Sequence, residues 1–166
     1  MTPGLTIRFA SSEDLPLVEQ LAREIWPETY REILSPEQLA YMLELIYSQA
    51  ALNRQFNTEK QTFLLAYLHE MPAGFASYSP VEPGVYKLHK IYVHPAVQGK
   101  GVGKSIIEFV AEELRRKPAT TLLLNVNRYN KAKIFYEKLG FKVIREEDID
   151  IGNNYYMNDY VMSYKL

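Results

Sequence analysis

The sequence predicts an α/β fold in which helices pack on a mixed sheet, and three observations lead to this class. Segments whose apolar residues recur at helical spacing alternate with short apolar segments of the kind that form strands. The pattern turns from helix-like to strand-like near Thr62 and back to helix-like near Gly101. No internal repeat, low-complexity tract or linker divides the 166 residues, so we expect one domain over residues 1–166.

The N-terminal third is expected to form a short strand at residues 6–9 and then two helices. The first helix follows Ser11 and Asp14, whose spacing is that of a capping box. The second begins at Ser35, with proline at the first helical position and Gln38 placed to complete a second box. Apolar residues then recur at helical spacing in both segments.

The remaining elements continue the alternation and give the order β-α-α-β-β-β-α-β-α-β-β. Pro and Gly mark most of the boundaries between them. We expect strands at 62–68, 73–81 and 85–93, a helix at 101–117, a strand at 121–127, a helix at 130–139, and strands at 142–151 and 155–166.

Charge and composition exclude several classes of function. The formal net charge is −1, so no broad field draws the chain to nucleic acid or an anionic membrane, and we expect neither as a partner. The absence of cysteine rules out disulfides and a cysteine nucleophile, and the three histidines lack a metal-ligand pattern. The N-terminal residues lack the features of a signal peptide and no apolar run could span a bilayer, so we expect a cytoplasmic location.

A glycine-rich stretch between a strand and a helix is the most informative part of the sequence. Its backbone N–H groups and the helix dipole favour an anion such as a pyrophosphate, although glycine-rich turns also arise from packing alone. The nucleoside-triphosphate loop needs four residues between its first Gly and its Gly-Lys-Ser, whereas only three lie between Gly99 and the Gly-Lys-Ser at 103–105 here. The dinucleotide fingerprint also fails, because its third glycine would fall on Lys104 or Ile106.

The stretch resembles instead the (Gln/Arg)-x-x-Gly-x-(Gly/Ala) signature of the GNAT superfamily of N-acetyltransferases, through Gln98, Gly101 and Gly103. Residues 88–95 before it and the Phe-Tyr-Glu-Lys-Leu-Gly-Phe segment at 135–141 are similar to the family as well. The resemblance implies the family's fold, a mixed and mostly antiparallel sheet with helices on both faces. It also implies acetyl-CoA as co-substrate, with no metal.

The resemblance further implies which residues bind the coenzyme and carry the chemistry. Tyr136 would act on the leaving thiolate; because a phenol is the weaker acid of the two, it would mainly donate a hydrogen bond to the sulfur. A backbone N–H near Val93 would polarise the acetyl carbonyl. Coenzyme-binding residues would be Ile91, Tyr92 and Val93 for the pantetheine, Gln98, Gly99, Lys100, Gly101, Val102, Gly103 and Lys104 for the pyrophosphate, and Asn130, which also suits a helix N-cap.

A general base is needed because an alkylamine arrives mostly protonated. His89 is the first choice, because polyamine acetyltransferases resemble one another in carrying Glu at this position and aralkylamine acetyltransferases in carrying His. Glu82, in the preceding loop, is the second candidate for the general base. Members that acetylate protein N-termini often have Glu in the next strand, where this sequence has Asn125, and that departure weakens a protein-acetylating function.

The acceptor is expected to be a small primary amine such as a polyamine, bound near the first two helices and the last hairpin. Trp26, Tyr30 and Tyr155 are the candidate acceptor-binding residues. Glu146, Asp148 and Asp150 would share one strand face, which could attract a polycation or be simply a solvated edge. A protein or peptide acetyltransferase and a non-catalytic acyl-CoA sensor remain alternatives. A homodimer is a family-level expectation.

Overall fold

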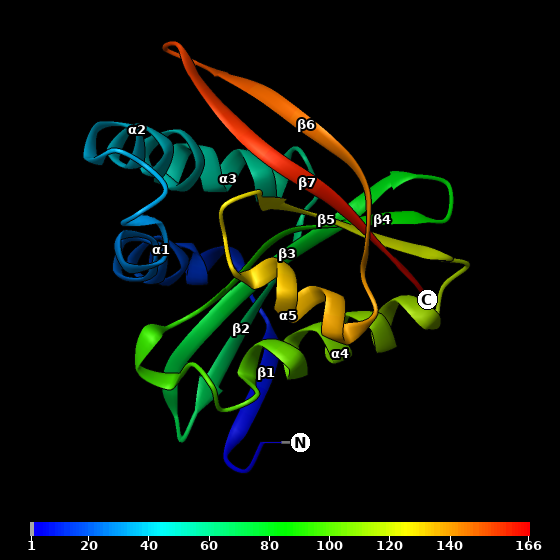
Figure 1. Ribbon diagram of the computed structural model, residues 1–166. Helices are drawn as coiled ribbons and strands as arrows, with labels where there is room; N and C mark the ends of the chain where they lie inside the picture. The colour runs from blue at the N-terminus through cyan, green and yellow to red at the C-terminus, as the bar shows by residue number, and fades with distance from the viewer. Residues whose placement is uncertain (1) are drawn as a thin grey trace.

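The computed structural model describes residues 2–166 and contains seven strands and five α-helices in that part of the chain (Figure 1). In chain order these are β1 (Leu5–Phe9), α1 (Leu15–Tyr30), α2 (Pro36–Tyr47), α3 (Gln49–Asn57), β2 (Thr62–Leu68), β3 (Met71–Glu82), β4 (Val85–Val93), α4 (Val102–Arg115), β5 (Thr121–Asn127), α5 (Ala132–Leu139), β6 (Lys142–Gly152) and β7 (Tyr155–Lys165).

All seven strands join one sheet in the order β1-β2-β3-β4-β5-β7-β6. Only β4 and β5 pair in parallel, and the other neighbours are antiparallel. Two hydrophobic cores lie on opposite faces: α4 and α5 cover one, and α1, α2 and α3 cover the other. The predicted mixed, mostly antiparallel sheet with helices on both faces is therefore confirmed; α4 and α5 lie in front of the sheet in Figure 1.

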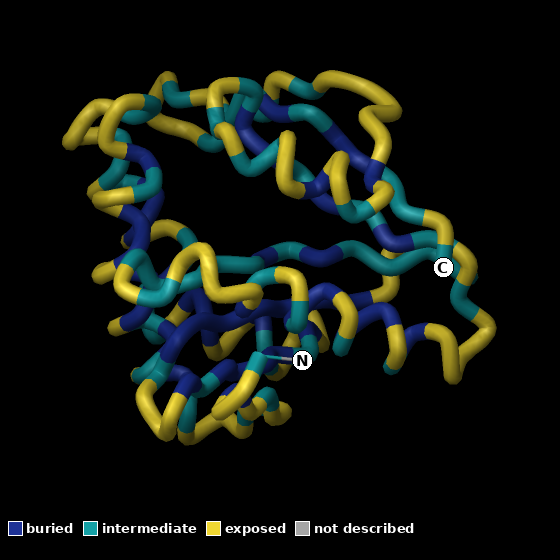
Figure 2. The backbone as a smooth tube through the Cα atoms, turned by 60° about the horizontal axis from the view of Figure 1, so that its bottom comes forward, coloured by how far each residue is buried: buried dark blue, intermediate teal, exposed yellow. Residues whose placement is uncertain are grey.

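Burial follows this layering. Buried residues run along the central strands and the inward sides of the helices, whereas the loops and much of β6 at the sheet edge are exposed (Figure 2). Strand β4 crosses the middle of the sheet and contributes to both cores, through Leu88 on the α4 side and Tyr92 on the α1 side. None of the helices in residues 2–166 is long and apolar enough to cross a membrane.

The two central strands separate partway along their length. The parallel pairing of β4 with β5 ends at Leu88 and Leu124. On the other side of β4, Tyr78 pairs with Leu88 and Ser77 with Lys90, so His89 is an extra residue in a β-bulge. A bulge bends the strand that carries it. Residues 89–93 consequently have no partner strand on the β5 side, and a split opens between β4 and β5.

Helix α3 was not predicted from the sequence. Ser48 ends α2 and also caps α3, accepting a hydrogen bond from Ala51 N at 3.2 Å. Only a few apolar residues of α3 face the core, among them Leu52 and Phe56, and the rest of the helix is polar. Hydrophobic periodicity is weak over such a short segment, so Ser48 was the main available signal for this helix.

Two other expectations about helix starts need correction, and one helix is longer than its apolar pattern indicates. Helix α1 runs through Pro27 to Tyr30, whereas the apolar residues at helical spacing end at Ile25. The Gln38 side chain does not close a capping box at Ser35; its Nε2 donates to the Tyr156 carbonyl at 3.1 Å and so ties α2 to β7. Helix α5 begins at Ala132, two residues later than expected.

Candidate active site

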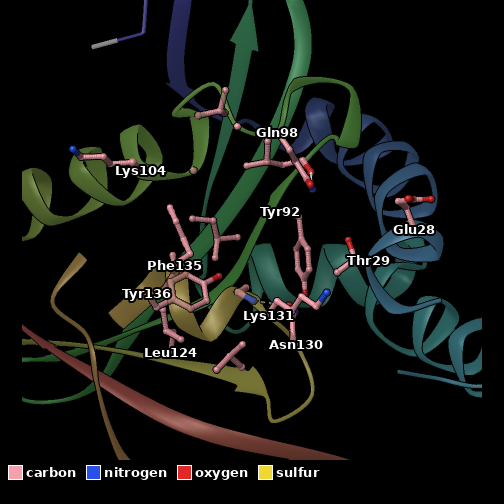
Figure 3. A pocket seen from close by; sticks show the side chains of 18 of the residues that line it. Glu28, Thr29, Tyr92, Gln98, Lys104, Leu124, Asn130, Lys131, Phe135 and Tyr136 are labelled. Atoms are coloured by element: carbon pink, nitrogen blue, oxygen red, sulfur yellow. Dashed lines mark hydrogen bonds between the residues drawn. The ribbon is translucent and has the colours of Figure 1, made fainter. Parts of the chain in front are cut away.

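A cavity of about 930 Å³ lies in the split between β4 and β5. Its wall comes from the end of α1, from β4, from the glycine loop with the start of α4, and from the facing ends of β5 and α5 (Figure 3). The volume is within the range of small-molecule and cofactor sites. Cavity-lining residues that the sequence predicted are Tyr30, His89, Ile91, Tyr92, Val93, Gln98, Gly99, Gly101, Val102, Gly103, Lys104, Asn130 and Tyr136.

The glycine loop presents unused backbone donors to this cavity. Gly101 is the N-cap of α4 at φ +81°, a conformation in which a Cβ would be strained. The first main-chain bond across this turn runs from Ser105 N to Gly101 O, so the N–H groups of Val102, Gly103 and Lys104 have no acceptor in the helix. No side chain in the described part of the chain, residues 2–166, caps these groups. They and the positive end of the helix dipole form an anion site.

Two contacts hold this loop against β4 and α5. The Gln98 side chain donates from Nε2 to the Val93 carbonyl at 3.1 Å, which fixes the loop on the end of β4. A Cβ added at Gly103 would lie 3.3 Å from Phe135 Cζ and 3.6 Å from Val93 Cγ2. Glycine therefore keeps the first turn of α4 close to both neighbours without filling the cavity. Lys100 is the loop residue that does not line the cavity; its carbonyl accepts from Thr2 Oγ1 at 2.8 Å.

Tyr136 projects from α5 into the cavity (Figure 3). Its ring packs edge-on against Phe135 and Phe141, with centroids 5.3 and 5.8 Å away. Its hydroxyl makes no hydrogen bond within residues 2–166 and remains free to donate to a ligand. Burial is the main reason that the pKa of Tyr136 is raised well above its ordinary value, so the phenol keeps its proton.

Of the two candidate bases, His89 lines the cavity and Glu82 does not. Glu82 is exposed at the end of β3, where it pairs with Val85 at the other end of β4. His89 Nε2 lies 2.6 Å from Ser79 Oγ. Burial, helped by the positive charges of Lys90 and Lys87, lowers the pKa of His89 to about 4. His89 is therefore neutral near pH 7, a weaker base than the unperturbed imidazole that the sequence suggested.

Only one of the three predicted acceptor-binding aromatic residues, Tyr30, reaches the cavity. Its hydroxyl is hydrogen-bonded to that of Tyr92 at 2.8 Å. Trp26 was expected to bind the acceptor, but it is 2% exposed and stacks behind these two rings as part of the core. Tyr155 packs on Tyr41 instead and does not line the cavity. The residue type of Trp26 and its place near the first helix suggested a binding role, but they did not reveal which way its ring points.

The acidic residues Glu146, Asp148 and Asp150 of β6 are exposed and absent from the cavity wall. Arg128 approaches two of them, with its nitrogens 3.8 Å from Glu146 and 2.6 Å from Asp148. The charge of this face is thus partly neutralised by the chain itself, and the structure does not join it to the cavity.

Asn130 lines the cavity, and its Oδ1 accepts from Ala132 N at 2.9 Å. Its side chain thus caps the first turn of α5 from two residues before the helix. Sequence reasoning missed Glu28 and Thr29, which enter the wall because α1 continues past Pro27. It noted Asn125 only as a departure from the family, although Asn125 lines the cavity on the β5 side.

Comparisons with known proteins agree with this geometry. The model of the acetyltransferase (GNAT) domain matches residues 30–156. The chain is 29% identical over 159 residues to spermidine N(1)-acetyltransferase of Thermoplasma acidophilum, covering 93% of this chain and 96% of that protein. It is 30% identical over 112 residues to peptidyl-lysine N-acetyltransferase YjaB of Escherichia coli, covering 63% and 73%.

A solved structure of PaiA N-acetyltransferase from Thermoplasma acidophilum, in complex with coenzyme A, is similar with a TM-score of 0.81. That similarity extends over 98% of this chain and 99% of the other at 29% identity. The split sheet, the glycine loop and the free tyrosine define an acetyl-CoA-dependent N-acetyltransferase. This chain belongs to the GNAT acetyltransferase family.

Proposed function

We propose that this protein transfers the acetyl group of acetyl-CoA to the primary amino group of a small amine such as a polyamine, by direct attack in a ternary complex. One observation carries the proposal: a single cavity joins a free strand edge and unused helix N–H groups to an unbonded tyrosine hydroxyl and to polar groups of β4 and β5.

The residues present fit the coenzyme. A chain of amides such as pantetheine can add to the free edge of β4 at Ile91, Tyr92 and Val93 as a further strand would. The unused N–H groups at the start of α4 would take the pyrophosphate. Gly103 leaves room there because a larger residue would press on Phe135. The coenzyme supplies the reactive thioester when it is bound.

Three groups of this chain would then act on the reacting atoms. A backbone N–H on the free edge near Val93 polarises the acetyl carbonyl, the kind of donor whose loss can raise a barrier by about 3 kcal/mol. Tyr136 donates its hydroxyl proton in a hydrogen bond to the thioester sulfur as negative charge develops there. In the tautomer in which His89 Nε2–H donates to Ser79, Nδ1 can accept a proton from the amine or from an intervening water.

The acceptor end of the cavity favours a small molecule over a peptide. Tyr41 of α2 donates its hydroxyl to the Ile151 carbonyl at 2.6 Å, and Gln38 donates to the Tyr156 carbonyl at 3.1 Å. These bonds tie the β6–β7 hairpin to α2, where the two lie close together in Figure 1. The hairpin is therefore held against α2, which leaves less room for an extended peptide to pass between the two. The similarity to a spermidine acetyltransferase supports the same choice.

Acetyl-CoA is expected to raise the melting temperature, whereas ATP with magnesium is expected to leave it unchanged. A ligand at 100 times its Kd stabilises a protein by about 2.7 kcal/mol, which is roughly 5 to 10 °C for a chain of this size. Gly103→Val tests the coenzyme site directly. The valine side chain would meet Phe135 and Val93, so this variant should show less than half of the wild-type shift. A shift with ATP alone, or an equal shift in both proteins, would contradict the placement of the coenzyme.

His89→Gln is expected to lower kcat/KM by less than about tenfold and to leave its pH profile unchanged in shape. His89 is neutral across pH 6 to 9, because its pKa is lowered to about 4, so the rise over that range follows deprotonation of the amine itself. Glutamine can keep a hydrogen bond to Ser79. An inflection near pH 6.5 in the kcat/KM profile of the wild type that is absent from the profile of the variant would show instead that His89 titrates as the base.

A further inference from the structure

Asp159 is a buried carboxylate near the middle of β7, 2% exposed. Its Oδ2 accepts a hydrogen bond from Asn125 Nδ2 at 3.2 Å. Its Oδ1 is buried and accepts no hydrogen bond from residues 2–166, and within that part of the chain no cation forms an ion pair with it at 4.0 Å or less. A buried carboxylate with so few hydrogen-bonding partners destabilises the folded protein, so we expect Asp159 to have a role in the site.

Asn125 connects this carboxylate to the cavity. Asp159 is the cross-strand neighbour of Asn127, and Asn125 lies two residues from Asn127 on β5, so all three side chains share one face of the sheet. An ionised carboxylate only accepts hydrogen bonds, so the amide nitrogen of Asn125 must face Asp159. The amide oxygen is then turned away from the carboxylate. It makes no hydrogen bond within residues 2–166, and Asn125 lines the cavity.

Charged groups of both signs from the neighbouring elements surround Asp159, and Arg128 is one of them, since its Nη1 donates to the Asp159 carbonyl at 3.4 Å. Glu147 of β6 is the cross-strand partner of Asp159; its pKa is lowered chiefly by a hydrogen bond from Arg145 and less by the nearby Asn125 amide. Burial is the main reason that the pKa of Asp159 is raised, and the charge of Glu147 adds to that effect. The hydrogen bond from Asn125 and the charges of Lys87, on the same face of β4, and of Arg128 act in the opposite direction. Across the cavity, burial raises the pKa of Tyr30 to about 12, and the charge of Asp159 adds to that effect.

We propose that Asp159 is a positioning residue for the amine acceptor: it fixes the Asn125 amide so that its Oδ1 accepts an N–H of the acceptor's amino group, and its charge favours a cationic amine. Asn125 is the residue that touches the acceptor. The inference rests on the proposed function and adds the residues that recognise the substrate. Bound in this way, the nitrogen lies at the β5 wall, opposite the free edge of β4.

The test compares Asp159→Asn with wild type by two independent measurements. Calorimetric binding of spermidine to the coenzyme A complex is expected to weaken at least tenfold, and the KM for spermidine to rise to match, while the KM for acetyl-CoA changes less than about twofold. Asn125→Ala should give the same result, and the double variant should be no worse than either single one, since Asp159 acts through Asn125. Glu112→Gln is the matched control: it removes one negative charge from the exposed face of α4, outside the cavity wall, and should change nothing.

A swapped pair, Asn125→Asp with Asp159→Asn, separates charge recognition from a structural role. It restores one carboxylate and one amide to the corner, so it should recover most of the lost spermidine affinity. Unchanged spermidine binding in Asp159→Asn or in Asn125→Ala would overturn the inference, as would a wild type that does not bind spermidine. If wild type and Asp159→Asn bind spermidine equally well and both acetylate it, only this inference fails. If wild type binds spermidine but acetylates no amine, the proposed function fails instead.

Discussion

Tyr136→Phe is expected to lower kcat by about 100-fold and to leave the KM for acetyl-CoA within about twofold. The change removes one hydroxyl that makes no hydrogen bond within residues 2–166, so the packing on Phe135 and Phe141 and the melting temperature should be preserved. A 100-fold loss corresponds to about 2.7 kcal/mol of transition-state stabilisation. Stopped-flow measurement of thiol release under saturating amine isolates the chemical step.

Tyr47→Phe is the matched control for that experiment. Tyr47 is 1% exposed, lies in the core on the α1 side and does not line the cavity, so its variant should keep wild-type kcat. Because burial raises the pKa of Tyr136, we also expect no loss of activity from its ionisation below about pH 10. Equal kcat in Tyr136→Phe and wild type would mean that the hydroxyl has no chemical role. Binding of acetyl-CoA without any acetyl transfer by wild type would favour the alternative of an acyl-CoA sensor.

Lys90→Met is expected to stabilise the fold by about 2 kcal/mol or more at pH 6, and much less at pH 10. Lys90 is 5% exposed in the α1-side core, where its Nζ lies 3.3 Å from Gln61 Oε1 and over the rings of Tyr47 and Phe63. Burial lowers its pKa from 10.5 to about 7, a difference that corresponds to about 5 kcal/mol. Methionine would recover only part of this, because it loses the Gln61 and ring contacts.

The direction of the pH dependence follows from proton binding. Between about pH 7 and 10 the folded protein has lost the Lys90 proton while the unfolded chain keeps it, so the free energy of unfolding from this site rises with pH. Below about pH 7 both states hold the proton and the penalty is full. Urea unfolding of wild type and variant at several pH values should show converging stabilities above pH 7. Lys142→Met, on the exposed edge strand, is the control; a Lys90→Met variant that is less stable than wild type at pH 6 would contradict the argument.

The chemistry of the coenzyme site could be predicted from the sequence because it is local. Glycine positions decide where backbone N–H groups are free and where a Cβ is absent, and the spacing of Gln98, Gly101 and Gly103 is visible along the chain. Tyr136 was identified in the same way, from its place in a short motif. The strands were found because alternating and apolar runs are also local signals. The corresponding residues do meet in one cavity.

The acceptor side depends on contacts between distant segments, and there the sequence was a poor guide. Trp26 and Tyr155 have the residue type of binding aromatics, but packing directs both rings away from the cavity. His89 has the type of a base, but burial against Ser79 and the nearby lysines lowers its pKa to about 4. Asp159 shows nothing unusual as one acidic residue among many, until the register of β5 with β7 places it behind Asn125.

The sequence by itself determined the order of the elements other than α3, the family's glycine loop and the residues whose backbone could hold a coenzyme. Those features depend on residue type and spacing, which do not change on folding. Only the tertiary structure decided where β4 and β5 separate, because the bulge at His89 exists only relative to its partner strand. It also decided which polar side chains are buried, and burial sets their pKa values and their hydrogen-bonding partners.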